Sequence, residues 1–291
     1  MSLAASLKNY WKLTKPRIWT LLVFTGIVAM LVAYRQTLGS SFSLSLALVT
    51  VCSLVLGSAS ADVLTNYNDR DIDGIMKRTR NRALPTGAIK PRNALVFGIT
   101  MAILSVLLPL LLVNFLAASF MLIGLVDNVV VYSVLLKRKS WTSIVLGGFS
   151  GGMPVLVGFS AVAGTVSPIA LYMSALVIVW IPTHVWSLAV FSKDDYAAAN
   201  VPMLPVVFGE RVAAVCIAGT SALLTVFSLA LIFFSPSVFY AASAVLLGAV
   251  VLAYSAKLAI DKKRETAWTL FKLTSPYLAI IFLLLGLTEW L

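Results

Sequence analysis

Long apolar segments recur along the whole chain, and short polar turns separate them. Each segment is close to the roughly 20 residues that an α-helix needs to cross a bilayer. The segments are much longer than the roughly ten-residue alternating strands of a membrane β-barrel. Proline and glycine mark several turns, as at Pro109, Gly164 and Pro236. The pattern predicts about nine membrane-spanning helices, at residues 17–34, 44–68, 92–108, 112–134, 143–163, 168–190, 211–234, 237–256 and 270–289.

The composition supports an all-α membrane protein. Hydrophobic residues make up 60% of the 291 residues and charged residues only 11%, whereas an ordinary soluble domain carries roughly 25% charged residues. No stretch has the composition of a soluble domain or of a disordered tail. We therefore expect residues 1–291 to form a single polytopic membrane domain, a bundle of about nine helices.

The basic residues fall on one side of the predicted bundle. With nine spans, the N-terminus shares a side with the loops near 70–92, 136–142, 191–210 and 257–269, and this side holds every Lys and Arg except Arg35. Basic loops of membrane proteins stay in the cytoplasm. We therefore predict a multi-pass protein of the cell membrane with a cytoplasmic N-terminus. The net charge of +11 then anchors the chain in the lipid bilayer and does not indicate nucleic-acid binding.

The densest cluster of charge follows the second apolar segment, in TNYNDRDIDGIMKRTRNRALPTG (65–87). If the second helix continues to about residue 73, four polar side chains share one helix face: Asp62, Asn66, Asp69 and Asp73. Carboxylates arranged in this way repel one another, and the C-terminal end of the helix dipole adds to the repulsion. Mg²⁺ shared with a phosphate ligand would relieve it, because Mg²⁺ prefers oxygen ligands. The motif therefore predicts a site for magnesium and a phosphate-bearing ligand.

The bases that follow these acids would meet the phosphate directly. Arginine binds phosphate with bidentate geometry and lysine binds it as a point charge. The candidates are Arg70, Lys77, Arg78, Arg80 and Arg82. The alternative is a charged loop that only fixes topology, and it stays open for Lys77, Lys90 and Arg92.

A second acidic segment, FSKDDYAAANVPMLPVVFGE (191–210), follows the sixth span as the first motif follows the second span. Asp194 and Asp195 are adjacent, so only one of them would point into a given site on a regular helix. Lys193 supplies a base beside them. Two acid-rich helix ends on one side of a bundle suggest two metal clamps on one diphosphate, which would stabilise it as a leaving group.

Tyr132 lies just inside the membrane, before the bases Lys137, Arg138 and Lys139. A tyrosine ring can stabilise a nearby cation, and these bases could reach the diphosphate. The alternative is a tyrosine of the interfacial belt followed by bases that only set topology.

Three polar positions inside apolar segments are further candidates. His184 is the single histidine and sits in WIPTHVWS, where Pro182 is expected to break or bend the helix. A buried histidine can equally be a hydrogen-bonded structural residue. Asp127 and Asn128 lie within the fourth span, where an acid is a functional candidate by default. Gly147, Gly148, Gly151 and Gly152 are expected to allow close helix packing.

The first motif resembles that of the UbiA superfamily of intramembrane aromatic prenyltransferases, and more narrowly that of its haem-farnesylating branch. Four further stretches carry the narrower resemblance: TKPRIWTLLVFT (14–25), VVYSVLLKRKSWTSIVLGGFSGGMPVLVGFSAVAG (130–164), WIPTHVWSLAVFSKDDY (180–196) and ANVPMLPVV (199–207). The resemblance covers most of the chain through about residue 210. The last three spans match in hydropathy alone.

The resemblance implies a nine-helix UbiA-type fold and Mg²⁺-dependent transfer of a farnesyl group. The donor would be farnesyl diphosphate and the acceptor the 2-vinyl group of haem B, giving haem O, with a haem-handling membrane protein as a possible downstream partner. Asp69 and Asp73 would hold Mg²⁺ in the first site, and Asp195 would act in the second with Asp194 as a further candidate. His184 becomes a candidate ligand of the haem iron.

Two positions depart from the superfamily pattern. The asparagine that usually precedes the first aspartate by four residues is Thr65 here, so either Asn66 or Asp62 would complete the metal shell. Phe191 occupies the first position of the second acidic motif, a departure that the haem branch shares.

Two alternatives remain. A transferase of this superfamily could act on a quinone precursor, a chlorin or a prenylated glycerol phosphate instead of haem. A secondary transporter is the alternative of a different class, although transporters usually bind their substrates near the membrane midplane.

Overall fold

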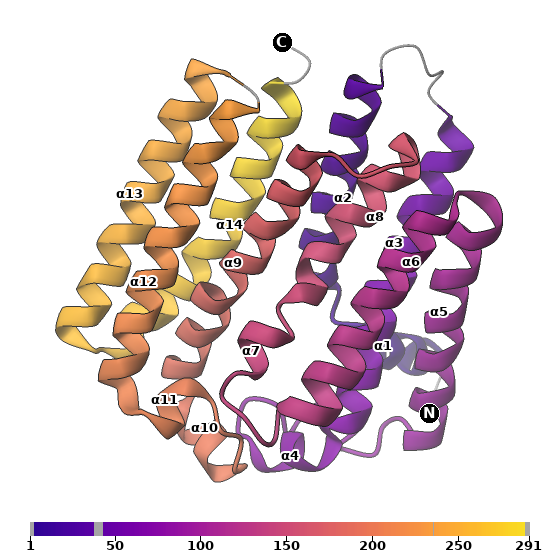
Figure 1. Ribbon diagram of the computed structural model, residues 1–291. Coiled ribbons are helices and arrows are strands. Elements are labelled where there is room, and N and C mark those ends of the chain that lie inside the picture. Colours follow the sequence, from indigo (N-terminus) through magenta and orange to yellow (C-terminus); the bar gives the residue numbers. More distant parts are fainter. Residues whose placement is uncertain (1–2, 38–42, 235, 289–291) are drawn as a thin grey trace.

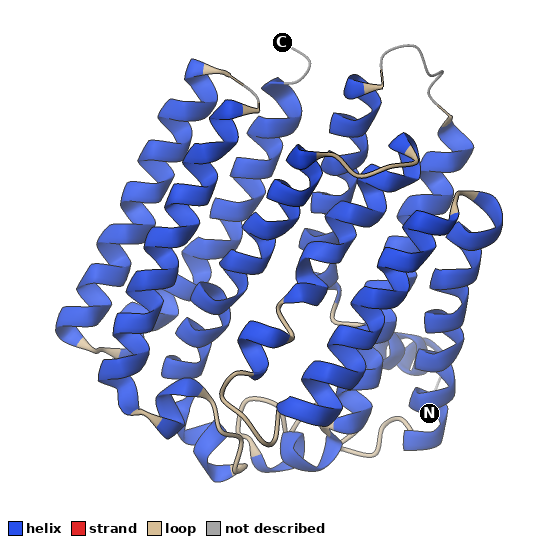
Figure 2. Ribbon diagram, viewed as in Figure 1, coloured by secondary structure: helices blue, strands red, loops and turns tan. Residues whose placement is uncertain are grey.

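The computed structural model describes residues 3–37, 43–234 and 236–288, and this part of the chain is helical, without strands (Figure 2). Nine helices in it are long and apolar enough to cross a membrane, as the sequence predicts. The spans are α2 (Pro16–Gln36), α3 (Leu44–Asn68), α5 (Pro91–Leu112), α6 with η1 (Phe115–Leu125, Val126–Leu136), α7 with α8 (Ser143–Leu146, Phe149–Ala163), α9 (Pro168–Phe191), α12 with η2 (Gly209–Ala230, Leu231–Phe233), α13 (Val238–Asp261) and α14 (Arg264–Thr288). Four short helices lie outside the spans: α1 (Leu3–Leu13), α4 (Arg70–Ile75), α10 (Lys193–Ala198) and α11 (Leu204–Val207).

Two prolines that were expected to interrupt helices lie inside continuous ones. The third span continues through Pro109 to Leu112, and α9 runs unbroken through Pro182. Of the expected break or bend at Pro182, the break is therefore wrong. Membrane helices tolerate proline because neighbouring groups satisfy the freed backbone carbonyl. The last span also starts earlier than predicted, so the expected loop 257–269 shrinks to Lys262 and Lys263.

The spans form a ring in chain order. Each span packs on the next one, and α14 also packs on α9 and on α2, which closes the ring. α8 lies deepest, and its residues 151–161 are all buried. Gly158 lets α8 approach α2 closely, because a methyl group at this position would lie 2.1 Å from the carbonyl oxygen of Gly26. Figure 1 shows the helices side by side, with α4, α10 and α11 at one end of the bundle.

The helix that carries the first motif is interrupted. α3 ends at Asn68, and Asp69 has φ −89° and ψ 1° before α4 begins. The expectation of one regular helix to residue 73 is therefore wrong, although the Asp73 N–H still bonds to the Asp69 carbonyl at 2.8 Å. Of the two acids of α4, Asp73 is buried at the mouth, whereas Asp71 is exposed.

A π-helix, η1, forms the end of the fourth span. At its end the Lys137 N–H bonds to the carbonyl of Tyr132, five residues earlier, at 2.8 Å. π-helical turns occur frequently at functional sites. Asp127 in η1 accepts the Ser150 N–H at 2.7 Å, and thereby caps the start of α8 from a neighbouring helix. This contact gives the intramembrane acid a structural partner.

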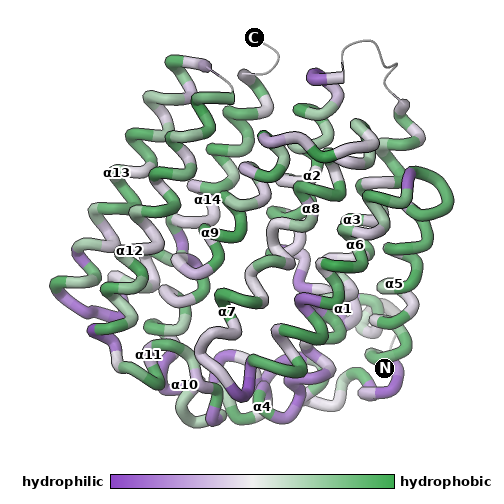
Figure 3. Tube along the Cα trace, viewed as in Figure 1, coloured by the Kyte–Doolittle hydropathy of each residue, from purple (hydrophilic) through white to green (hydrophobic). Residues whose placement is uncertain are grey.

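Polarity is sorted along the bundle axis. Hydrophilic residues gather at the end formed by α4 and α10, while the helices above them are mostly apolar (Figure 3). Large apolar side chains face outward on the spans, as with Leu111, Leu246 and Ile260. An outer surface of this kind suits lipid contact and leaves one end for polar chemistry.

Candidate active site

Two buried carboxylates form the centre of the polar end. Asp69 is 3% exposed and Asp73 4%. Arg82 donates from Nη1 to Asp73 Oδ2 at 2.7 Å and to Asn66 Oδ1 at 3.2 Å. Lys137 donates to Asp69 Oδ2. Each acid is thus paired with a base from a loop that follows a spanning helix.

One carboxylate oxygen has no partner. Asp69 Oδ1 is buried and accepts no hydrogen bond from the residues that the structure describes. A buried acceptor without a partner is costly, and a cation would satisfy it. Within the described ranges, no group of three or more His, Cys, Asp or Glu side chains is arranged to hold a metal ion. The donor set that fits Mg²⁺ is therefore two carboxylates and an amide, with the remaining ligands left to phosphate and water.

The two acidic motifs meet. Asp195 accepts the backbone N–H of Lys77 at 3.1 Å and that of Arg78 at 3.0 Å, with one carboxylate oxygen for each. The Arg78 guanidinium also reaches the Tyr196 hydroxyl at 3.4 Å. Asp195 therefore ties α10 to the basic loop after α4, and both of its oxygens already accept hydrogen bonds.

Several predicted site residues lie outside this centre. Asp194 is exposed and forms a bidentate pair with Arg264, with distances of 2.5 and 2.8 Å. Lys193 lies 3.5 Å from Glu210. Asp194 and Asp195 are neighbours in α10, so their side chains leave the helix in different directions, and Asp195 is the one that contacts the first motif. We therefore leave Asp194 out of the metal site and Lys193 out of the diphosphate site.

Two bases of the first motif also point elsewhere. Arg70 lies over the Tyr67 ring, 4.5 Å from its centroid, and donates to the Tyr67 carbonyl at 2.7 Å. The Lys77 side chain is exposed. The exposed position of Lys77 supports its topology alternative, and Arg70 contacts Tyr67 in place of the buried acids, which Arg82 does reach.

An apolar cavity of about 500 Å³ lies inside the bundle. Tyr132 lines it, and the Lys137 ammonium lies 5.5 Å from the centroid of the Tyr132 ring. Close packing builds the opposite wall, because a methyl group on Gly151 would lie 2.3 Å from Ile181. The cavity also reaches Arg17, Leu21, Ile144, Val185, Leu188 and Ser275.

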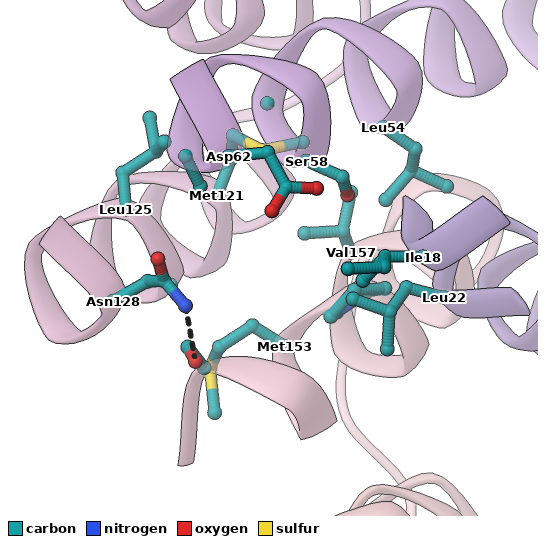
Figure 4. Close-up of a pocket in the computed structure, with 15 residues that line it drawn as sticks. Ile18, Leu22, Leu54, Ser58, Asp62, Met121, Leu125, Asn128, Met153 and Val157 are labelled. Atoms are coloured by element: carbon teal, nitrogen blue, oxygen red, sulfur yellow. Dashed lines mark hydrogen bonds between the residues drawn. The ribbon is translucent and has the colours of Figure 1, made fainter. Parts of the chain in front are cut away.

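A smaller lobe of about 100 Å³ adjoins this cavity. Figure 4 shows Asp62 from α3 and Asn128 from η1 facing it from different helices. Asp62 accepts a hydrogen bond from Lys15 at 3.1 Å. Asn66 shares Arg82 with Asp73, so Asn66 is the better placed of the two candidates for completing the metal shell. The lobe and the cavity share four lining residues: Ile18, Leu22, Asn128 and Ser150.

His184 lines the cavity at its far side. Its ring is stacked between Trp180 and Phe271, with centroid distances of 4.4 and 4.3 Å. His184 Nδ1 lies 2.8 Å from Thr274 Oγ1, which itself donates to the Phe271 carbonyl at 2.9 Å. In the tautomer in which Nδ1 donates to Thr274, the neutral ring keeps a lone pair on Nε2.

Comparison with known proteins places this arrangement in a family. Residues 22–284 match the model of the UbiA prenyltransferase family. The chain belongs to this family.

Relatives of this UbiA-family chain agree with the narrower resemblance. It is similar to the protoheme IX farnesyltransferase of Thermoplasma volcanium, with 42% identity over 99% of this chain and 100% of the relative. It is also similar to the enzyme of the same name from Desulforudis audaxviator, with 42% identity over 98% of this chain and 89% of the relative. The predicted resemblance to the haem branch is confirmed, and a prenyltransferase is favoured over the transporter alternative.

Solved structures agree on the fold. A structure of digeranylgeranylglyceryl phosphate synthase has a TM-score of 0.77 at 19% identity, covering 98% of each chain. A UbiA homologue from Archaeoglobus fulgidus, bound to GPP and Mg²⁺, has a TM-score of 0.67 at 18% identity, covering 95% of this chain and 99% of that one. The predicted UbiA-type bundle is confirmed.

Sequence reasoning missed two residues of this UbiA site. Asp71 forms a bidentate pair with Arg138, at 2.6 and 2.7 Å, and the same guanidinium donates to the Asn68 carbonyl at 2.5 Å. Hydrogen bonding from Arg138 lowers the pKa of Asp71 to about 2, and Asp71 raises the pKa of Arg138. The pair joins α4 to the loop that carries Lys137, so Arg138 positions the site and does not line it.

The second missed residue is Lys15, which pairs with Asp62 at the joint between α1 and α2. Its backbone is left-handed, with φ 49° and ψ 61°, immediately before Pro16. A residue other than glycine is strained in this backbone conformation, and such strain is common at ligand clamps. The sequence could have indicated Lys15, because this lysine directly precedes Pro16, the proline at which the first span begins.

Proposed function

We propose that this chain transfers the farnesyl group of farnesyl diphosphate to the 2-vinyl group of haem B, giving haem O. The observation that carries the proposal is the pair of buried acids, Asp69 and Asp73, joined to an apolar cavity of about 500 Å³ through Lys137, which pairs with Asp69 and lies over the cavity-lining Tyr132 ring. Acids with adjacent bases suit a diphosphate with a metal ion, and the cavity suits an isoprenoid. The names of the relatives support haem as the acceptor.

Asp69 and Asp73 would hold Mg²⁺, with Asn66 as the third protein ligand. The ion would neutralise charge on the diphosphate as it leaves. The Archaeoglobus fulgidus homologue, which is bound to GPP and Mg²⁺, supports this use of a metal. Lys137 and Arg82 pair with the acids here, and both would turn to the phosphate oxygens. Charge-assisted bonds of this kind are the strong ones.

The remaining residues would guide the chemistry. The C–O bond of the prenyl diphosphate breaks, and its electron pair leaves with the diphosphate oxygen. The allylic cation lies beneath the Tyr132 ring, whose face stabilises positive charge. The vinyl carbon of the porphyrin attacks this cation, and the resulting cation takes up water and loses a proton. The apolar walls keep water away before the carbon–carbon bond forms.

His184 would hold the porphyrin. The lone pair of Nε2 belongs to an imidazole whose tautomer is fixed by Thr274, and a neutral imidazole of this kind is a good iron ligand. The stacked rings of Trp180 and Phe271 keep the imidazole plane in one orientation. In this proposal the chain lies in the cell membrane as one domain, with its N-terminus and active-site mouth in the cytoplasm. A haem-handling membrane protein would receive the product.

The test is a transfer assay with purified protein, haem B, farnesyl diphosphate and Mg²⁺, with the product identified by mass. The expected product is haem O. Asp69→Asn and Asp73→Asn should each lower its rate roughly 100-fold or more, since both remove a charge from the metal site. Glu265→Gln removes an exposed charge outside the site and is the control. Normal rates in both Asn variants, or product formed from another acceptor in place of haem, would contradict the proposal.

A further inference from the structure

A separate polar cavity of about 270 Å³ lies at the mouth, under α1. α1 and its joint with α2 form one wall, the end of α3 forms another, and the loop 76–90 closes the third. Its lining consists of Asn9, Lys12, Leu13, Lys15, Asn66, Arg78, Asn81, Arg82, Ala83, Thr86 and Ala88.

The cavity is built for an anion. Four of its lining residues are bases, three are asparagines, and none is an acid. Lys12 and Asn81 are exposed, and within the described part of the chain their side chains have no hydrogen-bond or ion-pair partner. The cavity therefore offers a free ammonium and a free amide beside Arg78 and Arg82.

Two of the bases connect this cavity to the active site. Arg82 lines the cavity and also donates to Asp73 at 2.7 Å. Lys15 lines it as well and is paired at 3.1 Å with Asp62, which faces the small lobe beside the main cavity. One layer of ion pairs therefore separates the basic cavity from the acids that face the substrates.

We propose that this basic cavity binds inorganic pyrophosphate as it leaves the active site. The inference rests on the proposed function, which forms pyrophosphate at Asp69 and Asp73. A multivalent anion is excluded from the apolar cavity below by its desolvation cost, whereas Arg82 can follow it from the acids into the basic cavity. An intact prenyl diphosphate fits poorly there, because Leu13, Ala83 and Ala88 are the only apolar lining residues and form no wall for a long tail.

The lining residues allow pyrophosphate to bind without a metal ion. Without a carboxylate, the cavity needs no divalent ion to bind pyrophosphate, whereas the site at Asp69 and Asp73 repels an anion unless a metal is present. Binding in EDTA therefore isolates the basic cavity from the active site.

The experiment is calorimetric titration of the detergent-solubilised full chain with sodium pyrophosphate in EDTA. The chain should bind, and the double variant Lys12→Ala/Asn81→Ala should raise Kd by about tenfold or more, because it removes the two groups that are free for the ligand. Lys8→Ala removes the same charge from an exposed position of α1 that does not line the cavity, and should change Kd by less than about twofold. No metal-free binding, or equal Kd values for the double variant and the parent, would overturn the proposal.

A second titration tests whether the basic cavity binds free pyrophosphate or the prenyl diphosphate substrate. Farnesyl thiolodiphosphate in Mg²⁺ instead of EDTA should bind at Asp69 and Asp73, with a Kd that the double substitution leaves unchanged. A loss of its binding as large as that of pyrophosphate would reassign the cavity to the substrate and overturn the proposal. The transfer assay on the same preparation separates the two claims. Haem O formation without metal-free pyrophosphate binding removes this inference alone. Metal-free binding without haem O formation removes the proposed function and with it the release role, and leaves only an anion-binding cavity.

Discussion

At the scale of single residues, Asp127 is the acid whose role the structure changes most. Its Oδ2 accepts the Ser150 N–H at 2.7 Å, at the start of α8. Asp127→Ala should destabilise the protein by about 1 kcal/mol, the usual cost of a lost helix cap, while Asp127→Asn keeps an acceptor and should stay close to the parent. Thermal unfolding in detergent measures both, and transfer activity per folded molecule should stay unchanged. An Asn variant that is stable but inactive would assign a catalytic carboxylate to this position.

The same scale shows which site residues a sequence can find. Asp69 and Asp73 could be proposed from the sequence because acids at a membrane boundary are rare and costly, so their spacing alone is informative. The choice between Asp194 and Asp195 was not possible, because it depends on which face of α10 packs against the loop of Lys77 and Arg78. Arg138 was assigned to the ligand because its partner, Asp71, is 67 residues away in the chain. Pairings across loops follow from tertiary packing and leave no local pattern.

At the scale of elements, the helices were predictable and their irregularities were not. Runs of about 20 apolar residues fix a span whatever its neighbours are, which explains why all nine were found. The continuation through Pro109 and the π-helical end of the fourth span depend on contacts with other helices, so hydropathy carries no signal for them. The small residues of the fifth span were correctly expected to allow close packing, as at Gly151 against Ile181.

The crossing of α8 and α2 gives a prediction at this scale. Gly158→Ala places a methyl carbon 2.1 Å from the Gly26 carbonyl oxygen, and backbone cannot move aside as a flexible side chain can. We expect a loss of about 1–3 kcal/mol in stability, the usual cost of overpacking, together with lower activity because α2 and α8 both line the substrate cavities. Thermal unfolding and the transfer rate measure these effects.

α12 supplies the matched control for this substitution. Gly219 is exposed there, and a methyl group at its position would meet no atom within 4 Å. Gly219→Ala should be neutral or stabilising by up to about 1 kcal/mol, because alanine is the better helix former. Equal thermal midpoints for Gly158→Ala and Gly219→Ala would show that the close crossing does not limit stability.

At the scale of the whole molecule, charge distribution and site geometry lead to the same end of the bundle. The buried acids, the basic cavity and the short helices α4 and α10 all lie at the mouth. In the proposed function, substrates and products that carry phosphate would be exchanged with water at this end, and the isoprenoid and the porphyrin would occupy the apolar cavity. The sequence located this end through its bases, but could not show that a second, basic cavity lies beside the acids, because its walls come from three distant segments.

The orientation of this end is the last prediction. Basic loops stay on the cytoplasmic side, so the mouth should face the cytoplasm and the turn between α8 and α9 the outside. In a background with Cys52→Ser and Cys216→Ser, Ala198→Cys in α10 and Thr165→Cys in that turn are both exposed and uncharged. A membrane-impermeant maleimide should label only Thr165→Cys in intact bacterial cells and should label Ala198→Cys after lysis. Labelling of Ala198→Cys in intact cells would show that the bundle has the opposite orientation, with the mouth and pyrophosphate release outside the cell. Because the cell does not supply farnesyl diphosphate there, this result would contradict the assigned substrate as well as the topology.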